Sequence, residues 1–119
     1  MKKFTKNKTI TLRFRTVNRD TFLAIKNRKK KVETRAATTR YQNIKMGDMI
    51  TFVCGEDKFK RVVKKAKVFK TISAMLKIDK VKDIMPKLKS AKELTRVYYS
   101  YPSYRSKIKK FGLIALEFR

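Results

Sequence analysis

Hydrophobic and polar residues alternate strictly near the start of the chain. Ile10, Leu12 and Phe14 are separated by single threonine or arginine residues, and residues 9–15 follow this pattern throughout. A period of two places successive side chains on opposite faces of an extended backbone. Residues 9–15 are therefore predicted to form a half-buried β-strand.

The next segment has helical spacing. Thr16 or Asn18 is suited to cap a short helix, because either side chain can accept a hydrogen bond from a free backbone amide. This helix is predicted to end near Asn27. Its apolar side would be formed by Phe22, Leu23 and Ile25.

The middle of the chain predicts three more strands. A strand over residues 31–37 is followed by a polar loop, and the turn signal Gly47-Asp48 introduces a strand over residues 49–53. A hairpin turn over residues 54–57 then leads into a long strand over residues 59–69. Its alternation slips at two adjacent valines, Val62 and Val63, which predicts a bulge or bend that lets the sheet curl.

Helical spacing returns in the second half of the chain, over residues 72–76 and again after residue 90. Ser90 and Glu93 form a capping box ahead of the longer helix, and Pro102 is predicted to end it. The apolar positions of that helix are Leu94, Val97, Tyr98 and Tyr101.

A nearly continuous apolar run over residues 113–116, with Phe118 beyond it, predicts a final strand that is covered on both faces. Strands thus open and close the chain, with helices between them. This order favours an α+β fold, a small mixed β-barrel decorated by short helices. Neither a repeat nor a linker divides the chain, so we expect a single domain over residues 1–119, with residues 1–8 as a disordered N-terminal segment.

No apolar run approaches the roughly 20 residues that span a bilayer, and the chain starts with polar sequence. We therefore expect a cytoplasmic protein without a membrane partner. The single cysteine, Cys54, cannot form an internal disulfide, and its apolar surroundings predict a buried thiol that serves packing.

Positive charge dominates the composition: 34 lysine and arginine residues face nine aspartate and glutamate residues, for a formal net charge of +25. Lysine outnumbers arginine, a bias that an adenine-rich genome also produces. That bias does not explain the shortage of acidic residues. The charge is spread along the whole chain, so it coats a folded surface that attracts a polyanion, nucleic acid above all.

The chain has no histidine and only one cysteine. It therefore cannot form a Ser-His-Asp triad, a Cys-His pair or an ordinary zinc site of histidines and cysteines. No metal or cofactor is expected. Any catalysis would depend on lysine, carboxylate, hydroxyl or arginine side chains.

One of the few acidic residues, Glu33, lies within a run of five cations over residues 28–35. If Lys30 lies in the turn before the strand, Glu33 can hold Lys30 or Arg35 in a fixed position to bind a phosphate. As a base, Lys30 would need a depressed pKa, which neighbouring cations favour and Glu33 opposes. The alternative is an ordinary ion pair that stabilises the barrel by less than about 1 kcal/mol.

Aromatic residues interleaved with cations form a second candidate surface. Helical spacing assigns Tyr98 and Tyr101 to the core, which leaves Tyr99 and Tyr104, beside Arg105, as the candidates for stacking on a base. A third candidate is the loop over residues 38–42, whose functional side chains would be Arg40 and Tyr41.

The run over residues 28–35 resembles a motif of the ASCH domain family, Gly-x-Lys-x-x-Glu-x-Arg, which here reads Arg28-x-Lys30-x-x-Glu33-x-Arg35. Arg28 replaces the motif glycine. The resemblance covers about residues 9–119, through further matches at residues 44–50, 85–99 and 110–117. It implies a β-barrel of the PUA-like superfamily.

The resemblance implies two functions. The first is a monomeric RNA-binding module with a basic cleft between barrel and helices; its candidate RNA-binding residues are Lys29, Lys30, Lys31, Arg35, Arg40, Tyr41, Tyr99, Tyr104 and Arg105. The second is an enzyme that acts on RNA or a modified nucleoside through Lys30 and Glu33, either a ribonuclease or an N(4)-acetylcytidine amidohydrolase.

The amidohydrolase relatives have a threonine three residues after the motif lysine, where this chain has Glu33. Thr34 lies one position further and is expected to face away in a strand. This departure disfavours the amidohydrolase activity. We therefore expect the RNA-binding module.

Overall fold

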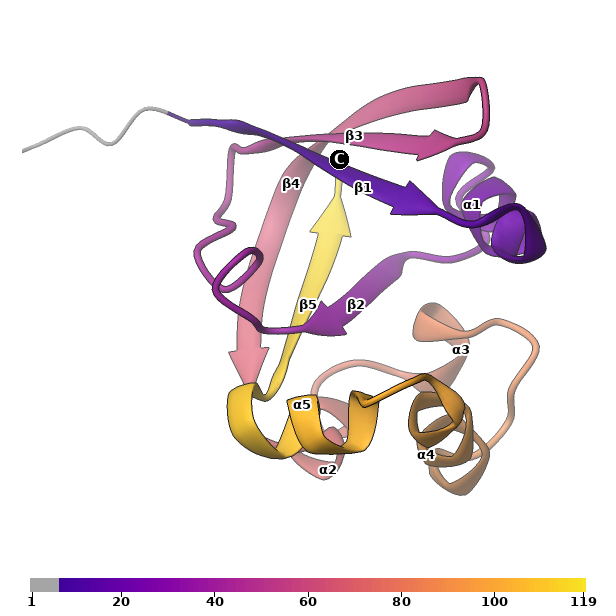
Figure 1. The fold of residues 1–119 in the computed structure, drawn as a ribbon, viewed down its shortest axis with the longest axis vertical. Helices are drawn as coiled ribbons and strands as arrows, with labels where there is room; N and C mark the ends of the chain where they lie inside the picture. The colour runs from indigo at the N-terminus through magenta and orange to yellow at the C-terminus, as the bar shows by residue number, and fades with distance from the viewer. Residues whose placement is uncertain (1–6) are drawn as a thin grey trace, which may run out of the picture.

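The computed structural model describes residues 7–119. Its centre is a five-stranded mixed sheet with the strand order β1-β3-β4-β5-β2 (Figure 1). The strands are β1 (Thr9–Phe14), β2 (Val32–Ala36), β3 (Met49–Cys54), β4 (Asp57–Phe69) and β5 (Leu113–Phe118). The chain has the expected α+β fold, and strands occur in all five predicted places.

Short helices connect the strands. They are the 3₁₀-helix η1 (Thr16–Asn18) and the α-helices α1 (Arg19–Lys26), α2 (Ile72–Leu76), α3 (Val81–Ile84), α4 (Ala91–Ser100) and α5 (Tyr104–Phe111). Helices α2 to α5 gather on one side of the sheet, at the bottom of Figure 1, whereas α1 lies beside β3. The pattern of the sequence did not predict α3 or α5.

The length of β4 makes the sheet curl into a half-barrel. Its first half pairs with β3 and its second half pairs with β5, and the register shifts between Val63 and Lys65. This irregularity lies next to the predicted bulge at Val62 and Val63. Because β1 and β2 are the two ends of the strand order, the half-barrel is open between them.

The sheet is covered on both faces, by two separate cores. The inner face packs Leu12, Phe52 and Leu116 against Phe22 and Ile25 of α1. The outer face packs under the helices α2 to α5, through Met75, Ile84, Leu94, Tyr98 and Leu113. Strand β5 contributes alternate residues to both cores, which confirms the prediction of a strand covered on two sides. Cys54 is buried in the inner core, as predicted.

Of the two helix caps that the sequence predicted, the structure has the one at Ser90 and lacks the one at the first helix. The Ser90 side chain accepts a hydrogen bond from the Glu93 amide (3.2 Å), and α4 ends two residues before Pro102. Thr71 caps α2 in the same way, which the sequence analysis did not predict. Asn18 lies at the N-cap of α1, but its side chain makes no capping hydrogen bond.

The predicted disordered segment over residues 1–8 falls mostly on residues 1–6, which lie outside the described residues. Lys8 is described, and both its backbone amide (3.0 Å) and its ammonium group (3.3 Å) contact the buried Asp48 carboxylate. Within residues 7–119, no helix has the length and apolarity needed to cross a membrane.

Candidate functional site

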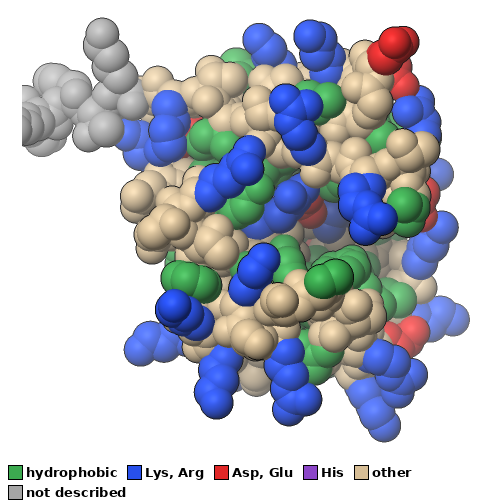
Figure 2. Space-filling view, viewed as in Figure 1, with side chains coloured by type: hydrophobic (Ala, Val, Ile, Leu, Met, Phe, Trp, Pro, Cys, Tyr) green, Lys and Arg blue, Asp and Glu red, His purple; other side chains and the backbone are tan. Residues whose placement is uncertain are grey.

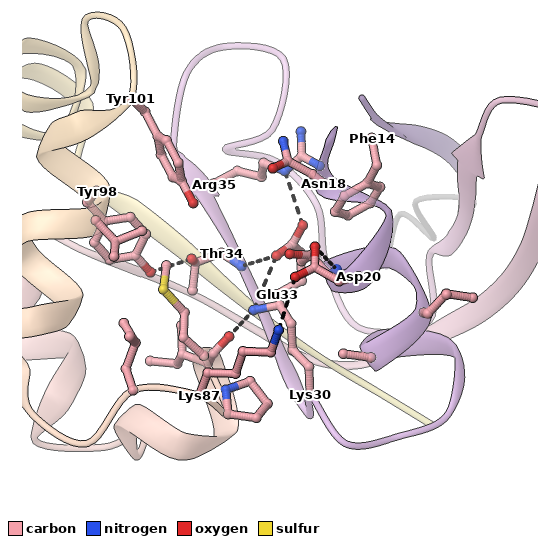
Figure 3. Close-up of a pocket in the computed structure, with 18 of the residues that line it drawn as sticks. Phe14, Asn18, Asp20, Lys30, Glu33, Thr34, Arg35, Lys87, Tyr98 and Tyr101 are labelled. Carbon is pink, nitrogen blue, oxygen red and sulfur yellow. Dashed lines mark hydrogen bonds and ion pairs between the residues drawn. The ribbon is translucent and has the colours of Figure 1, made fainter. Parts of the chain in front are cut away.

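A cleft of about 960 Å³ opens between the edge of β2 that no strand pairs with and the helices on either side of it. Residues of β1, α1 and β2 line one wall, and residues of α3, α4 and the following turns line the other. Figure 2 shows the hollow near the centre of this face, with lysine and arginine side chains around it. Figure 3 shows its interior.

Glu33 lies at the centre of the cleft, between Lys30 and Arg35 (Figure 3). Only 5% of its surface is exposed. Its Oε1 atom lies 3.5 Å from Lys30 Nζ, and its Oε2 atom accepts a hydrogen bond from Arg35 Nε (3.3 Å). The sequence predicted that Glu33 would hold one of these cations; it contacts both.

Lys30 lies just before β2, as predicted, and is as buried as Glu33. Its ammonium group donates to the carbonyl oxygens of Val32 (2.7 Å) and Ile84, besides its contact with Glu33. These three partners match the three N–H bonds of an ammonium group. Burial lowers the pKa of Lys30, and the charge of Glu33 opposes that shift.

Arg35 bridges the two edges of the half-barrel. Its guanidinium lies 5.0 Å from the ring centre of Phe14 and donates to the Arg13 carbonyl oxygen (3.5 Å), both on β1. Burial lowers the pKa of Arg35, but its interactions with Glu33, Tyr41 and Tyr104 together outweigh this, so the net shift is upward. The guanidinium is thus a permanent cation in a fixed position at the floor of the cleft.

Side chains satisfy the free backbone edge of β2. Thr34 donates its amide to Glu33 Oε1 (3.1 Å), Ala36 donates its amide to the Tyr104 hydroxyl (3.2 Å), and Val32 accepts from Lys30. An unpaired strand edge is a template for pairing with another chain. These three bonds occupy that edge and leave the adjoining space to a ligand.

Thr34 also lines the cleft, although it was expected to face away from Glu33 and so from the site. Its side chain does point to the other face of β2, where its hydroxyl shares a hydrogen bond of 2.5 Å with the Tyr98 hydroxyl. The cleft runs along the edge of the strand, however, so residues on both of its faces border the same space. Burial raises the pKa of Tyr98.

Exposed cations surround the mouth of the cleft. Arg13 and Arg15 come from β1 and the residue after it, Lys29 from the turn before β2, and Lys87 from the segment after α3. Lys87 pairs with Asp20 across the mouth at 3.4 Å, with 85% of the lysine side chain and 64% of the aspartate side chain exposed. Such an exposed pair contributes little stability and exchanges readily with another anion.

Three aromatic side chains line the cleft with exposed or partly exposed rings: Phe14, Tyr101 and Tyr104. Tyr98 is buried, as the sequence predicted. The prediction that Tyr101 belongs to the core was wrong: its residue surface is 39% exposed, because it follows the last residue of α4, where the helical spacing no longer applies. The Tyr101 and Tyr104 rings pack edge to face, 5.2 Å apart.

The structure separates the residues that the sequence proposed for binding. Lys29, Lys30, Glu33, Arg35 and Tyr104 line the cleft together. The other candidates do not line it: Lys31 lines a smaller pocket, Arg40 stacks on Tyr41 at 5.5 Å, and Arg105 stacks on Tyr99 at 5.1 Å.

Sequence reasoning missed several charged and aromatic side chains that line the cleft, among them Arg13, Phe14, Arg15, Lys87 and Tyr101. The alternation in β1 could have indicated Arg13 and Arg15, which share the face opposite the core. Nothing in the sequence pairs Lys87 or Tyr101 with β2. Within residues 7–119, no group of three or more acidic or cysteine side chains could hold a metal ion.

Comparison with known proteins places the chain among relatives whose names state no function. The crystal structure of the hypothetical protein PH0355 is similar to this structure, with a TM-score of 0.76 and 29% sequence identity, over 96% of this chain and 98% of that chain. Protein PF0455 from Pyrococcus furiosus, solved by NMR, matches with a TM-score of 0.65 and 30% identity, over 95% of this chain and 94% of that one. The chain belongs to the same family as PF0455. No protein-family model and no curated protein matches it.

Proposed function

We propose that this protein is an RNA-binding module of the ASCH type, within the PUA-like class of barrels, and that its cleft binds one nucleotide of a single-stranded RNA. The observation that carries the proposal is the cleft itself: a nucleotide-sized space with a partly buried arginine at its floor, aromatic rings in its walls and cations at its mouth. The ASCH resemblance supports it, because the three matching motif residues Lys30, Glu33 and Arg35 meet there.

The volume of about 960 Å³ suits a nucleotide. Small-molecule sites in proteins occupy roughly 300–1,000 Å³. A duplex is far too wide to enter such a space. RNA-binding proteins commonly read single-stranded segments, whose bases can be splayed out and stacked on aromatic or guanidinium planes. The cleft therefore favours an unpaired nucleotide as its ligand.

Each part of the cleft has a chemical role in this proposal. The exposed side chains of Arg13, Arg15 and Lys29 bind backbone phosphates at the mouth of the cleft. Tyr101 offers an exposed ring for the base, and the Arg35 guanidinium, which covers the Phe14 ring, offers a second planar group. Arg35 adds a cation whose position is set by Glu33 and by its contact with β1.

The buried ion pairs also stabilise the fold, so binding must be tested at residues outside them. In the double variant Arg13→Gln/Lys29→Gln, both changes lie at exposed cleft positions. The matched control Lys107→Gln/Lys109→Gln removes the same charge from exposed positions of α5, away from the cleft.

Affinity for a short single-stranded RNA, measured by fluorescence anisotropy over a range of salt concentrations, distinguishes the two. We expect the cleft variant to bind roughly tenfold more weakly at moderate salt, and its log-log salt slope to fall by about 0.7 for each phosphate that it no longer neutralises. The control variant should stay within about twofold of the wild type. Equal reductions in both variants would mean that binding follows net charge alone, and the cleft proposal would be abandoned.

The enzymatic alternative, a ribonuclease or acetylcytidine amidohydrolase, is favoured by one observation: the pKa of Lys30 is lowered by burial in a cleft that admits a nucleoside. Against it, three acceptors already surround the ammonium group. A neutral amine would leave one of them without a donor. Incubation with N(4)-acetylcytidine and with labelled RNA tests this alternative: a product that the wild type forms and that disappears in Lys30→Met, while circular dichroism shows the variant to be folded, would establish an enzyme.

A further inference from the structure

A second, smaller pocket of about 210 Å³ lies on the other side of the turn that precedes β2. Arg28, Lys31, Arg61 and Lys64 line it, with Glu117 as the one acidic residue. Within residues 7–119, no ion pair joins Glu117 to any of these cations. The pocket thus has four exposed or partly exposed cations against one carboxylate, and the Arg28 guanidinium in addition donates to the main-chain oxygen of Arg119 (3.4 Å).

The turn before β2 supplies cations to both pockets. Lys29 lines the cleft, Arg28 and Lys31 line the small pocket, and the buried Lys30 borders both. An RNA strand that leaves the cleft across this turn would therefore reach the small pocket next. Its volume is too small for a nucleotide but sufficient for a phosphate group.

Two cations of the small pocket, Arg28 and Arg61, lie near enough to repel each other. Arg61 donates to the Lys26 carbonyl oxygen (3.0 Å), which fixes its guanidinium beside the turn. Burial lowers the pKa of Arg61, and the charge of Arg28 lowers it further. An anion between the two guanidinium groups would relieve this repulsion.

Arg28 also has a backbone conformation that disfavours arginine. Its φ angle is +67°, in the left-handed region where a side chain is strained and glycine is not. Strain of this kind is concentrated at functional sites. The position therefore places a cation in the pocket at the expense of folding free energy.

We propose that the pocket formed by Arg28, Lys31, Arg61 and Lys64 binds a backbone phosphate of the same RNA strand whose nucleotide enters the cleft. This inference rests on the proposed function, and it adds a direction for the strand: across the turn over residues 27–31. A phosphodiester is the ligand because the pocket offers an excess of cations and little volume.

The test compares two probes, a short single-stranded RNA and cytidine 5′-monophosphate. In Lys31→Gln/Lys64→Gln, affinity for the RNA should fall roughly five- to tenfold and the salt slope by about 0.7 for each phosphate left without its cation, whereas affinity for the mononucleotide stays unchanged. The control Lys107→Gln/Lys109→Gln should bind both probes like the wild type. A pocket variant that binds RNA like this control would overturn the second site and leave the cleft proposal standing. A wild type that binds neither probe would overturn both.

Arg28 offers an independent variant. Arg28→Gly relieves the strained backbone, so its melting temperature should rise by about 2–4 °C while RNA affinity falls roughly threefold. Arg28→Lys keeps the charge and should retain most of the affinity. Tight RNA binding by Arg28→Gly, equal to that of the wild type, would contradict the assignment.

Discussion

Lys30 and Glu33 form a buried ion pair, with 3.5 Å between Nζ and Oε1, and each makes further polar contacts that keep both charged groups satisfied. The pair connects α3, through the Ile84 carbonyl, to the edge of β2. It therefore shapes the cleft and holds Arg35 in position at the same time. Its contribution to stability and its contribution to binding can be measured separately.

Removal of one partner should be costly. In Lys30→Met the Glu33 carboxylate keeps only one cation, and the carbonyl oxygens of Val32 and Ile84 lose their donor. We therefore expect the free energy of unfolding, measured with urea, to decrease by about 3–5 kcal/mol. Lys87→Met, which breaks the exposed pair with Asp20, should change it by less than about 0.5 kcal/mol. The double variant Lys30→Met/Glu33→Leu should recover part of the decrease. A small effect of Lys30→Met would show that the pair is energetically like a surface pair.

Stability should depend on alkaline pH through Tyr98. Burial raises its pKa, opposed by the hydrogen bond with Thr34, whereas the unfolded chain has a tyrosine pKa of about 10. Above that pH the unfolded state loses its proton first, so the free energy of unfolding falls as pH rises. Below a pH of about 10, Tyr98 is protonated in both states, and its contribution to the free energy of unfolding does not change with pH. In Tyr98→Phe the decline above a pH of about 10 should be shallower; an unchanged slope would exclude Tyr98 as its source.

Two exposed tyrosines, one in the cleft and one outside it, allow binding in the cleft to be distinguished from binding elsewhere. Tyr101 lines the cleft and Tyr99 stacks on Arg105 outside it, with 39% and 43% of their residue surfaces exposed. We expect Tyr101→Ser to weaken binding of single-stranded RNA by about tenfold, the range expected when one base can no longer stack on a ring. Tyr99→Ser should leave it nearly unchanged. The reverse order would favour the residue that helical spacing indicated, and would move the site out of the cleft.

Gly112 should tolerate no side chain. It has a φ angle of +77°, and an added Cβ would lie 2.2 Å from the Phe69 carbonyl oxygen, so Gly112→Ala is expected to lower the free energy of unfolding by more than about 3 kcal/mol. Gly55 also has a positive φ, but its Cβ would meet no atom within 4 Å. Gly55→Ala should therefore cost only about 1 kcal/mol. Similar decreases in urea unfolding would show that backbone strain, and not the clash, dominates at Gly112.

The sequence predicted the strands, and the contact of Glu33 with its neighbouring cations, better than the helices. Alternation in β1 and β4 and the continuous apolar run of β5 are local properties, so these strands could be recognised within a few residues. Helix α5 was missed because its three lysines and one arginine obscure a short stripe formed by Ile108 and Phe111. Helix α3 is four residues long, which is too short for a periodicity.

The candidate site could be predicted only in part. Lys30, Glu33 and Arg35 are close in sequence, so their contact follows from the turn and the strand that hold them. Phe14, Lys87 and Tyr101 reach the same cleft from segments far apart in the chain. Their approach depends on how the half-barrel curls and on where α4 ends, and no local pattern contains that information.

The central claim is that RNA binds in the cleft along β2, and an NMR titration of the ¹⁵N-labelled protein with a short single-stranded RNA tests it most directly. We predict that the amide signals of Glu33, Thr34, Arg35 and Tyr101 shift most, together and in a saturable manner. Shifts that spread evenly over the exposed lysines, with those four signals unmoved, would contradict the claim.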